Sequence, residues 1–344
     1  MPKGNKKCET KEYLFIHKQV AELKNECSAV SISSYSHNIY HLYRHLEDKN
    51  TPNLNNFLFR VYDPAFDLPY KRLIIQETKN NNTKRNKLNA LQVWFGDRVP
   101  TWIVSMRDDI NDKYNQAVIT DPKPCKCKWT DILSIRRRID LDVKNQKLRS
   151  RHRDNELLPD AQRKLLVDCV LWGLYTEAPL RNDFNLYYNP TKIHPNQLAE
   201  KYAGILPQCA EPQKYNWFSP NVKNAQIVIN EFKTNKTYEP IVFTPSKQLF
   251  NDLNSIYQQN SRHNQLLEGG FALALSTGDK YKVATKNDIS RILYSISKRY
   301  SPKKIGIRSS DIRHIYLTDK YKKTKDDSNA DAKLMGHSVA TQQK

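Results

Sequence analysis

The spacing of apolar residues constrains the fold of this chain more than any other feature. Through most of the sequence, apolar side chains recur every three or four residues, which is the period of an amphipathic helix. Between residues 222 and 245 the period changes to alternation, on two short runs joined by a turn at 234–236. The alternating residues are Ile227, Ile229 and Phe232 on the first run and Tyr238, Ile241 and Phe243 on the second. The sequence therefore predicts a mainly α fold with a small antiparallel β-sheet in its C-terminal domain.

The predicted helices fall into two groups. The first group covers 11–26, 31–50 and 81–99. The segment 112–130, which contains Pro122 and Pro124, is predicted to be a loop. The second group begins at Pro159 and Asp160 with a buried apolar stripe that ends at Leu174, and it continues over 246–259, 286–299 and 309–318.

These groups predict two domains, with a boundary near 150–157. We expect a basic N-terminal segment over 1–28, a helical domain over 29–150 and a second domain over 151–344. A basic stretch runs from Arg136 to Arg153, just before the boundary. It is either a linker that lies on phosphates or one exposed face of a helix.

The charge of the chain indicates a polyanionic partner. The 344 residues carry 56 Lys and Arg against 36 Asp and Glu, a net charge of +20. Residues 1–150 hold 27 basic and 17 acidic residues, and residues 151–344 hold 29 basic and 19 acidic residues. Each part therefore carries a net charge of +10. Two basic domains suggest a nucleic acid that is gripped from two sides. The alternative is a solvated, lysine-rich surface.

The six cysteines and the hydropathy indicate a soluble protein of a reducing compartment. The cysteines are scattered, unlike a disulfide framework, and no apolar run is long enough for a membrane span or a signal peptide. Cys125 and Cys127 are the only close pair, and neither a second pair nor histidines follow at zinc-ligand spacing. We therefore predict an intracellular protein without a bound metal ion.

The C-terminal motifs resemble the tyrosine recombinase and integrase family. Ile312-Arg313-His314 is followed by Leu334, Gly336, His337 and Ser338, and His337 lies 24 positions after Arg313. The resemblance also implies an earlier arginine just after a buried helix and a lysine on a β-hairpin. Arg181 matches the first, in Leu180-Arg181-Asn182-Asp183, and Lys233 matches the second, with Lys236 as the runner-up.

The resemblance implies a catalytic role for each of these residues. Arg181 and Arg313 would bind the nonbridging oxygens of a phosphodiester, because guanidinium groups are permanently charged bidentate donors. Lys233 would give a proton to the departing 5′ oxygen, and His337 would bind the phosphate and orient the nucleophile. No metal ion or other cofactor is needed.

Two positions depart from the family pattern. Ser310 stands where the family usually has a histidine, and a hydroxyl cannot act as a near-neutral base. The family nucleophile is a tyrosine about nine residues after the last histidine, here near residue 346. The sequence ends at Lys344, and no tyrosine follows Tyr321. We therefore expect this chain to bind DNA without cleaving it, with the nucleophile beyond Lys344.

The predicted function is site-specific DNA recombination by the integrase of a virus or mobile element, through a 3′-phosphotyrosyl intermediate. By resemblance, 29–150 would be a helical core-binding domain and 151–344 the catalytic domain of a two-domain DNA clamp. The protein would act on double-stranded DNA as a homotetramer, in the host nucleus or nucleoid. The alternatives are relaxation of DNA by a type IB topoisomerase and an inactive DNA-binding relative. The predicted DNA-binding residues are Lys84, Arg85, Lys87, Arg136, Arg137, Arg138 and Lys236.

Overall fold

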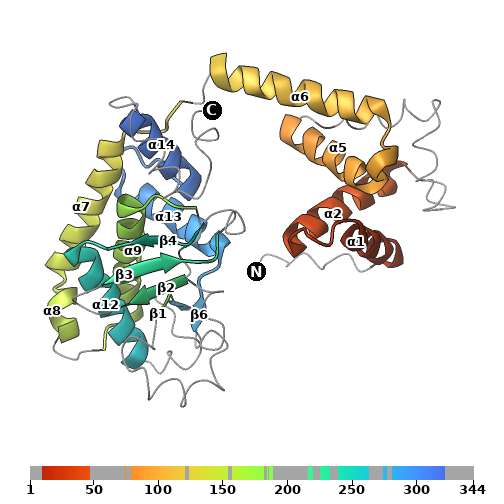
Figure 1. Cartoon of the computed structure of the whole chain (residues 1–344). Coiled ribbons are helices and arrows are strands. Elements are labelled where there is room, and N and C mark those ends of the chain that lie inside the picture. Colours follow the sequence, from red (N-terminus) through yellow and green to blue (C-terminus); the bar gives the residue numbers. More distant parts are fainter. Residues whose placement is uncertain are drawn as a thin grey trace. The chain divides into compact units, whose positions relative to one another are not determined.

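The chain forms two compact units, residues 1–123 (unit 1) and residues 124–344 (unit 2). Each unit has its own hydrophobic core, which is the physical reason for the division. The computed structural model of this protein (Figure 1) describes residues 10–46, 74, 78, 80–120, 124–153, 157–181, 184, 186–188, 216–219, 225–232, 239–262, 274–276 and 281–321.

Unit 1 is helical in its described part. Its elements are α1 (Lys11–Leu23), α2 (Ala29–Leu46), α5 (Asn81–Phe95), the 3-10 turn η3 (Gly96–Arg98) and α6 (Thr101–Thr120). The side chain of Asn80 begins α5 by accepting hydrogen bonds from the backbone N–H groups of Asn82 (2.8 Å) and Thr83 (3.3 Å). The helix ends at Gly96, whose φ of 54° is a conformation that glycine adopts without steric cost. The apolar faces of these helices form a single core.

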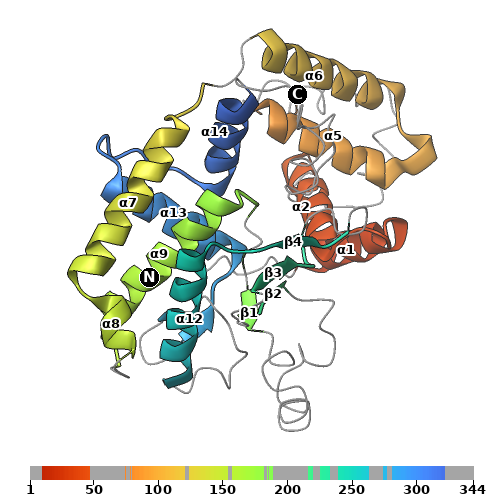
Figure 2. The ribbon, with the colours of Figure 1, turned by 60° about the vertical axis from the view of Figure 1, so that its left-hand side comes forward.

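In its described residues, unit 2 combines helices with two small sheets. Its helices are α7 (Trp129–Asn145), α8 (Leu148–Arg153), α9 (Asp160–Glu177), α12 (Lys247–Arg262), α13 (Lys286–Tyr300) and α14 (Ser309–Tyr321). Its strands are β1 (Leu186–Tyr188), β2 (Asn216–Ser219), β3 (Gln226–Ile229), β4 (Ile241–Phe243), β5 (Ala274–Ser276) and β6 (Tyr281–Val283). Within this unit, α9 lies between α7 and the sheet that contains β2, β3 and β4 (Figures 1 and 2).

The helix α9 is the centre of the core of unit 2. Every side chain from Leu165 to Tyr175 is buried, so the predicted stripe that ends at Leu174 is confirmed. The residues of α9 that lie outside the predicted stripe are buried as well, and Asp168 is one of them. A helix that is buried on all sides must be covered by other elements around its whole circumference. The neighbours α7, α12 and α13 provide that cover.

The predicted hairpin is confirmed in its two strands. β3 and β4 are antiparallel, with Ile227 opposite Phe243 and Ile229 opposite Ile241. β2 pairs with the other edge of β3, also antiparallel. β1 pairs with β2 in parallel, so this sheet is mixed rather than purely antiparallel. The predicted turn at 234–236 lies outside the described residues.

The division between the units lies after Lys123, earlier than the predicted boundary near 150–157. The helix α7 has a buried apolar face, and this face packs against α9. The buried residues of that face are Ile132, Ile135, Ile139 and Val143. Three consecutive arginines in the same helix obscured this helical period. The basic stretch is therefore neither a linker nor a fully solvated face, because α7 belongs to the core of unit 2.

The other predicted helices correspond to α1, α2, α5, α12, α13 and α14. The loop prediction for 112–130 is wrong at both ends, because α6 continues to Thr120 and α7 begins at Trp129. Pro122 and Pro124 lie between these two helices in the sequence, but they do not determine the residues at which α6 ends and α7 begins. None of the described helices is long and apolar enough to cross a membrane.

Candidate functional site

Arg181 lies just beyond the C-terminal end of α9. The hydroxyl of Tyr175 donates a hydrogen bond of 2.8 Å to the backbone carbonyl of Arg181. The ring of Tyr175 packs edge-on against Phe184, with 5.1 Å between the ring centroids. Leu180 is buried, whereas Arg181 keeps partial exposure to solvent. Core contacts on both sides therefore fix the backbone that carries this guanidinium group.

Ser310 and Arg313 lie on α14, which is anchored by its apolar residues. Ile312 and Ile315 are buried in the core of unit 2. Their burial leaves Ser310 and His314 exposed, and Arg313 half-buried between the two faces. The position of Arg313 on its helix is consequently set by core packing.

Arg181 and α14 lie at the same end of unit 2. α7 and α9 are antiparallel, and near the end of α9 the indole N–H of Trp172 donates to the carbonyl of Ile132 at 3.0 Å. The start of α7 also contacts α14, because the rings of Trp129 and Tyr316 meet edge-on with centroids 5.0 Å apart. Both views of the ribbon show α14 near this end of α9 (Figures 1 and 2).

The remaining predicted catalytic residues, Lys233 and His337, lie outside the described residues, as does Lys236. The strands β3 and β4 that flank the segment 233–238 are described, and they are paired as a hairpin. The assignment of these three residues therefore stays a prediction from the sequence.

The three predicted DNA-binding residues of α5 have different environments. Lys84 and Arg85 are partly exposed, and the guanidinium carbon of Arg85 lies 5.6 Å from the centroid of the Tyr114 ring. Lys87 is buried and donates a hydrogen bond of 2.9 Å to the hydroxyl of Thr78. Lys87 therefore serves the core of unit 1, and we do not retain it as a DNA contact.

The three consecutive arginines of α7 also differ in their environments. Arg137 and Arg138 are exposed, and Arg138 donates to the backbone carbonyl of Tyr300 at 3.0 Å. Arg136 points into the unit, where it donates to the carbonyl of Cys169 and forms an ion pair with Asp252. Arg136 is thus a structural residue, and of these three arginines Arg137 and Arg138 remain predicted DNA contacts.

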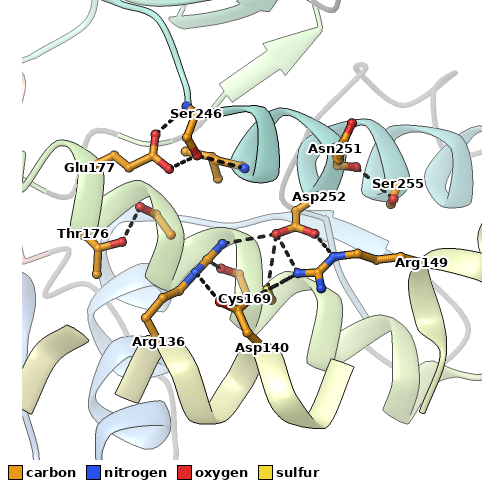
Figure 3. A network of polar contacts seen from close by, with 12 residues as sticks. Arg136, Asp140, Arg149, Cys169, Thr176, Glu177, Ser246, Asn251, Asp252 and Ser255 are labelled. Atoms are coloured by element: carbon orange, nitrogen blue, oxygen red, sulfur yellow. Dashed lines mark hydrogen bonds and ion pairs between the residues drawn. The ribbon is translucent and has the colours of Figure 1, made fainter. Parts of the chain in front are cut away.

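A buried ion-pair network that the sequence did not reveal surrounds Asp252 on α12. Asp252 is fully buried and receives Arg136 and Arg149 from two sides (Figure 3). Arg149 binds it with two nitrogens, at 2.6 Å and 3.1 Å, and Arg136 approaches to 3.2 Å. Asp140 completes the network with contacts of 3.3 Å to Arg136 and 3.2 Å to Arg149. The network ties α7, α8 and α12 together beside α9.

The same cluster contains residue types that bind metals, but its carboxylates are already paired with arginines. Ligand atoms of Asp140, Cys169 and Asp252 lie within 4.8 Å of one another. Arg136 and Arg149 bind both carboxylates, so their two positive charges already balance the two negative charges. Burial raises the pKa of the Cys169 thiol well above its usual value, which disfavours the thiolate that a metal requires. We therefore interpret the cluster as structural.

A second buried carboxylate, Asp168 of α9, is paired with an arginine of α13. Its carboxylate accepts a hydrogen bond of 3.0 Å from Arg299, whose side chain is 44% exposed. Burial raises the pKa of Asp168 to about 6, although Arg299 and Lys164 act to lower it. Ionised Asp168 therefore costs the folded state free energy, because desolvation outweighs the attraction of its partners.

We expect Asp168→Asn to change how stability depends on pH. Below about pH 4 the carboxyl group is protonated in both the folded and unfolded states. As the pH rises through about 6, the wild-type protein loses up to about 3 kcal/mol relative to the variant. Urea unfolding of both proteins between pH 4 and 7 measures this difference. Asp160→Asn, at an exposed carboxylate of the same helix, is the control, and parallel pH profiles for wild type and Asp168→Asn would contradict the prediction.

Comparison with known proteins identifies no relative of this chain. No family model, no curated protein and no solved structure matches it. The function must therefore be argued from the chain's own residues.

Proposed function

We propose that this protein cleaves and rejoins DNA strands as tyrosine recombinases do, as the integrase of a virus or mobile element. The observation that carries the proposal is the order Arg181, Lys233, Arg313 and His337, with His337 24 positions after Arg313 as the resemblance implies. Support comes from the elements around these positions. Arg181 follows a buried helix, residues 226–243 contain a hairpin, and Arg313 lies on a helix anchored in the core.

The chemistry of the proposed reaction explains why these residue types are required. A phosphodiester under attack accumulates negative charge on its nonbridging oxygens, and fixed guanidinium groups stabilise this charge most strongly in the transition state. In this proposal Arg181 and Arg313 bind those oxygens. Lys233 protonates the 5′ oxygen as the P–O bond breaks, and His337 orients the attacking tyrosine hydroxyl.

The distribution of charge supports a polyanionic partner for both units. Unit 1 holds 19 Lys and Arg against 14 Asp and Glu, a net +5. Unit 2 holds 37 against 22, a net +15, so the observed division assigns most of the excess charge to unit 2. Within unit 1, α5 contains Lys84 and Arg85 and no acidic residue. We propose that both units contact duplex DNA, and that the recombinase acts as a tetramer on two DNA sites.

Binding of duplex DNA should weaken steeply as the salt concentration rises, because lysine and arginine side chains that contact the phosphates release condensed counterions. Fluorescence anisotropy of a labelled duplex, with the whole chain at several salt concentrations, gives the slope. We expect Arg313→Ala to reduce the magnitude of this slope by about 1, the value for one phosphate contact. Arg291→Ala, at an exposed arginine of α13 that pairs with Asp288, is the control. A slope near zero for the wild type would contradict DNA as the partner.

Strand cleavage is tested with a nicked duplex, on which cleavage leaves the protein joined to DNA. The protein, expressed through its natural stop codon, should give an adduct that survives SDS, with or without a metal chelator. Joining of strands between two duplexes distinguishes recombination from relaxation of DNA by a topoisomerase. If the protein binds DNA but never forms an adduct, the proposed activity is wrong.

A second candidate function is DNA binding without catalysis, and Ser310 favours it. Ser310 is exposed on α14 three residues before Arg313, where the family usually has a histidine. A serine hydroxyl can donate a hydrogen bond to a phosphate oxygen but cannot take up a proton near neutral pH. Specific binding of DNA without any covalent adduct is the result that this candidate predicts.

A further inference from the structure

The segment 124–128 makes a hydrogen-bonded ion pair with α14, although most of the sequence of unit 2 lies between them. Lys126 Nζ donates to Asp311 Oδ2 at 2.8 Å and to the carbonyl of Gly306 at 3.2 Å. One turn further along, the rings of Trp129 and Tyr316 meet edge-on with centroids 5.0 Å apart. A polar contact from the segment and an aromatic contact from the first residue of α7 therefore reach the first two turns of the helix that carries Arg313.

The partners of Lys126 are themselves held in place. Asp311 Oδ2 also accepts the backbone N–H of Arg308 at 2.9 Å, so the same oxygen binds the loop before α14 and the lysine. A Cβ atom at Gly306 would overlap the ring of Tyr294 on α13, so only glycine allows the backbone to lie this close. Lys126 thus connects two fixed points, the loop packed on α13 and the first turn of α14.

We propose that Lys126 is a positioning residue, which sets the orientation of α14 and thereby of Arg313. The inference rests on the proposed function, in which Arg313 binds the phosphodiester. The segment 124–128 follows directly on the last residue of unit 1. Loss of the Lys126–Asp311 ion pair would therefore release the first turn of α14 and displace Arg313.

Two variants distinguish positioning from a direct contact between Lys126 and DNA. Lys126→Met removes a positive charge and Asp311→Asn removes a negative charge, so direct electrostatics predicts opposite effects on DNA affinity. Loss of positioning predicts that both variants weaken binding. Lys126→Arg retains the ion pair and should bind DNA like the wild type. Lys286→Met, which breaks the 3.6 Å pair with Glu231 elsewhere in unit 2, is the matched control.

Hydrogen exchange tests the positioning of α14 independently of DNA. In Lys126→Met and Asp311→Asn, we expect amides of 309–321 to exchange about tenfold faster, the effect of losing a hydrogen bond to a charged group. Lys286→Met should leave these rates unchanged. Unchanged exchange in α14 in both Lys126→Met and Asp311→Asn would overturn the inference.

The DNA measurement separates failure of the inference from failure of the proposed function. If Lys126 positions Arg313, Arg313→Ala should have less effect on affinity in the Lys126→Met background than in the wild type. Equal effects in both backgrounds, or tighter binding by Asp311→Asn, would overturn the positioning role. If Arg313→Ala alone leaves DNA affinity and its salt dependence unchanged, the proposed phosphate site is wrong and the inference about Arg313 falls with it, whatever the exchange rates of α14.

Discussion

Asp252→Ala should lower the free energy of unfolding of unit 2 by about 3–5 kcal/mol, the cost of removing one partner from a buried ion pair. Asp252 is fully buried, and it binds Arg136 and Arg149. Without it, one carboxylate of the network, the partly exposed Asp140, is left for two guanidinium groups. The network holds α12 against α7 and α8, so the loss should appear as a lower midpoint of urea unfolding.

An exposed ion pair provides the comparison for this prediction. Glu231→Gln, in the pair with Lys286, should cost less than about 1 kcal/mol, because both partners remain solvated. Arg149→Met combined with Asp252→Ala should cost less than the sum of the two single variants, since each removes the same interaction. A cost below about 1 kcal/mol for Asp252→Ala would show that the network does not stabilise unit 2.

In the protein expressed through its natural stop codon, Arg313→Ala should reduce the rate of covalent adduct formation on nicked DNA by about 100-fold to 1,000-fold. The reason is that its guanidinium group would bind oxygens whose negative charge grows in the transition state. Arg181→Ala should have an effect of similar size. Arg313→Lys should recover only part of the rate, because an ammonium group is a single point charge and cannot bind two oxygens in one plane.

The rate is measured by separating protein–DNA adducts on denaturing gels over time, at DNA concentrations well above the dissociation constant of the complex. Saturation with DNA removes any contribution from weaker binding. Arg137→Ala, at an exposed arginine of α7, should retain a wild-type rate under these conditions. Wild-type rates in Arg313→Ala would exclude Arg313 from the reaction.

Local patterns in the sequence predicted the elements that carry the candidate site. The helix before Arg181, the strands of the hairpin and the helix of Arg313 all follow from apolar spacing. Periodicity is sufficient where an element buries one face, and for α9, which is buried on all sides, the length of the apolar run indicates a helix rather than a strand. The boundary was predicted too late in the sequence because the consecutive arginines of α7 suggested a linker or an exposed face. The four buried residues of this helix nevertheless have helical spacing.

The network around Asp252 could not be predicted in the same way. Asp252 is 116 residues from Arg136 and 103 from Arg149, and no local motif marks any of the three. The same holds for Lys126 and Asp311, which are 185 residues apart. Surface lysines and arginines are common, so the sequence gives no sign of which cations are used internally.

The sequence by itself determined the elements that carry the candidate site and the order of residues that suggests phosphodiester chemistry, because both depend on spacing along the chain. Only the tertiary structure decided which cations serve the fold. It places Lys87 and Arg136 inside the two units and leaves Arg137 and Arg138 exposed. The physical reason is that desolvation of a charge depends on what packs around it, and those neighbours come from distant parts of the chain.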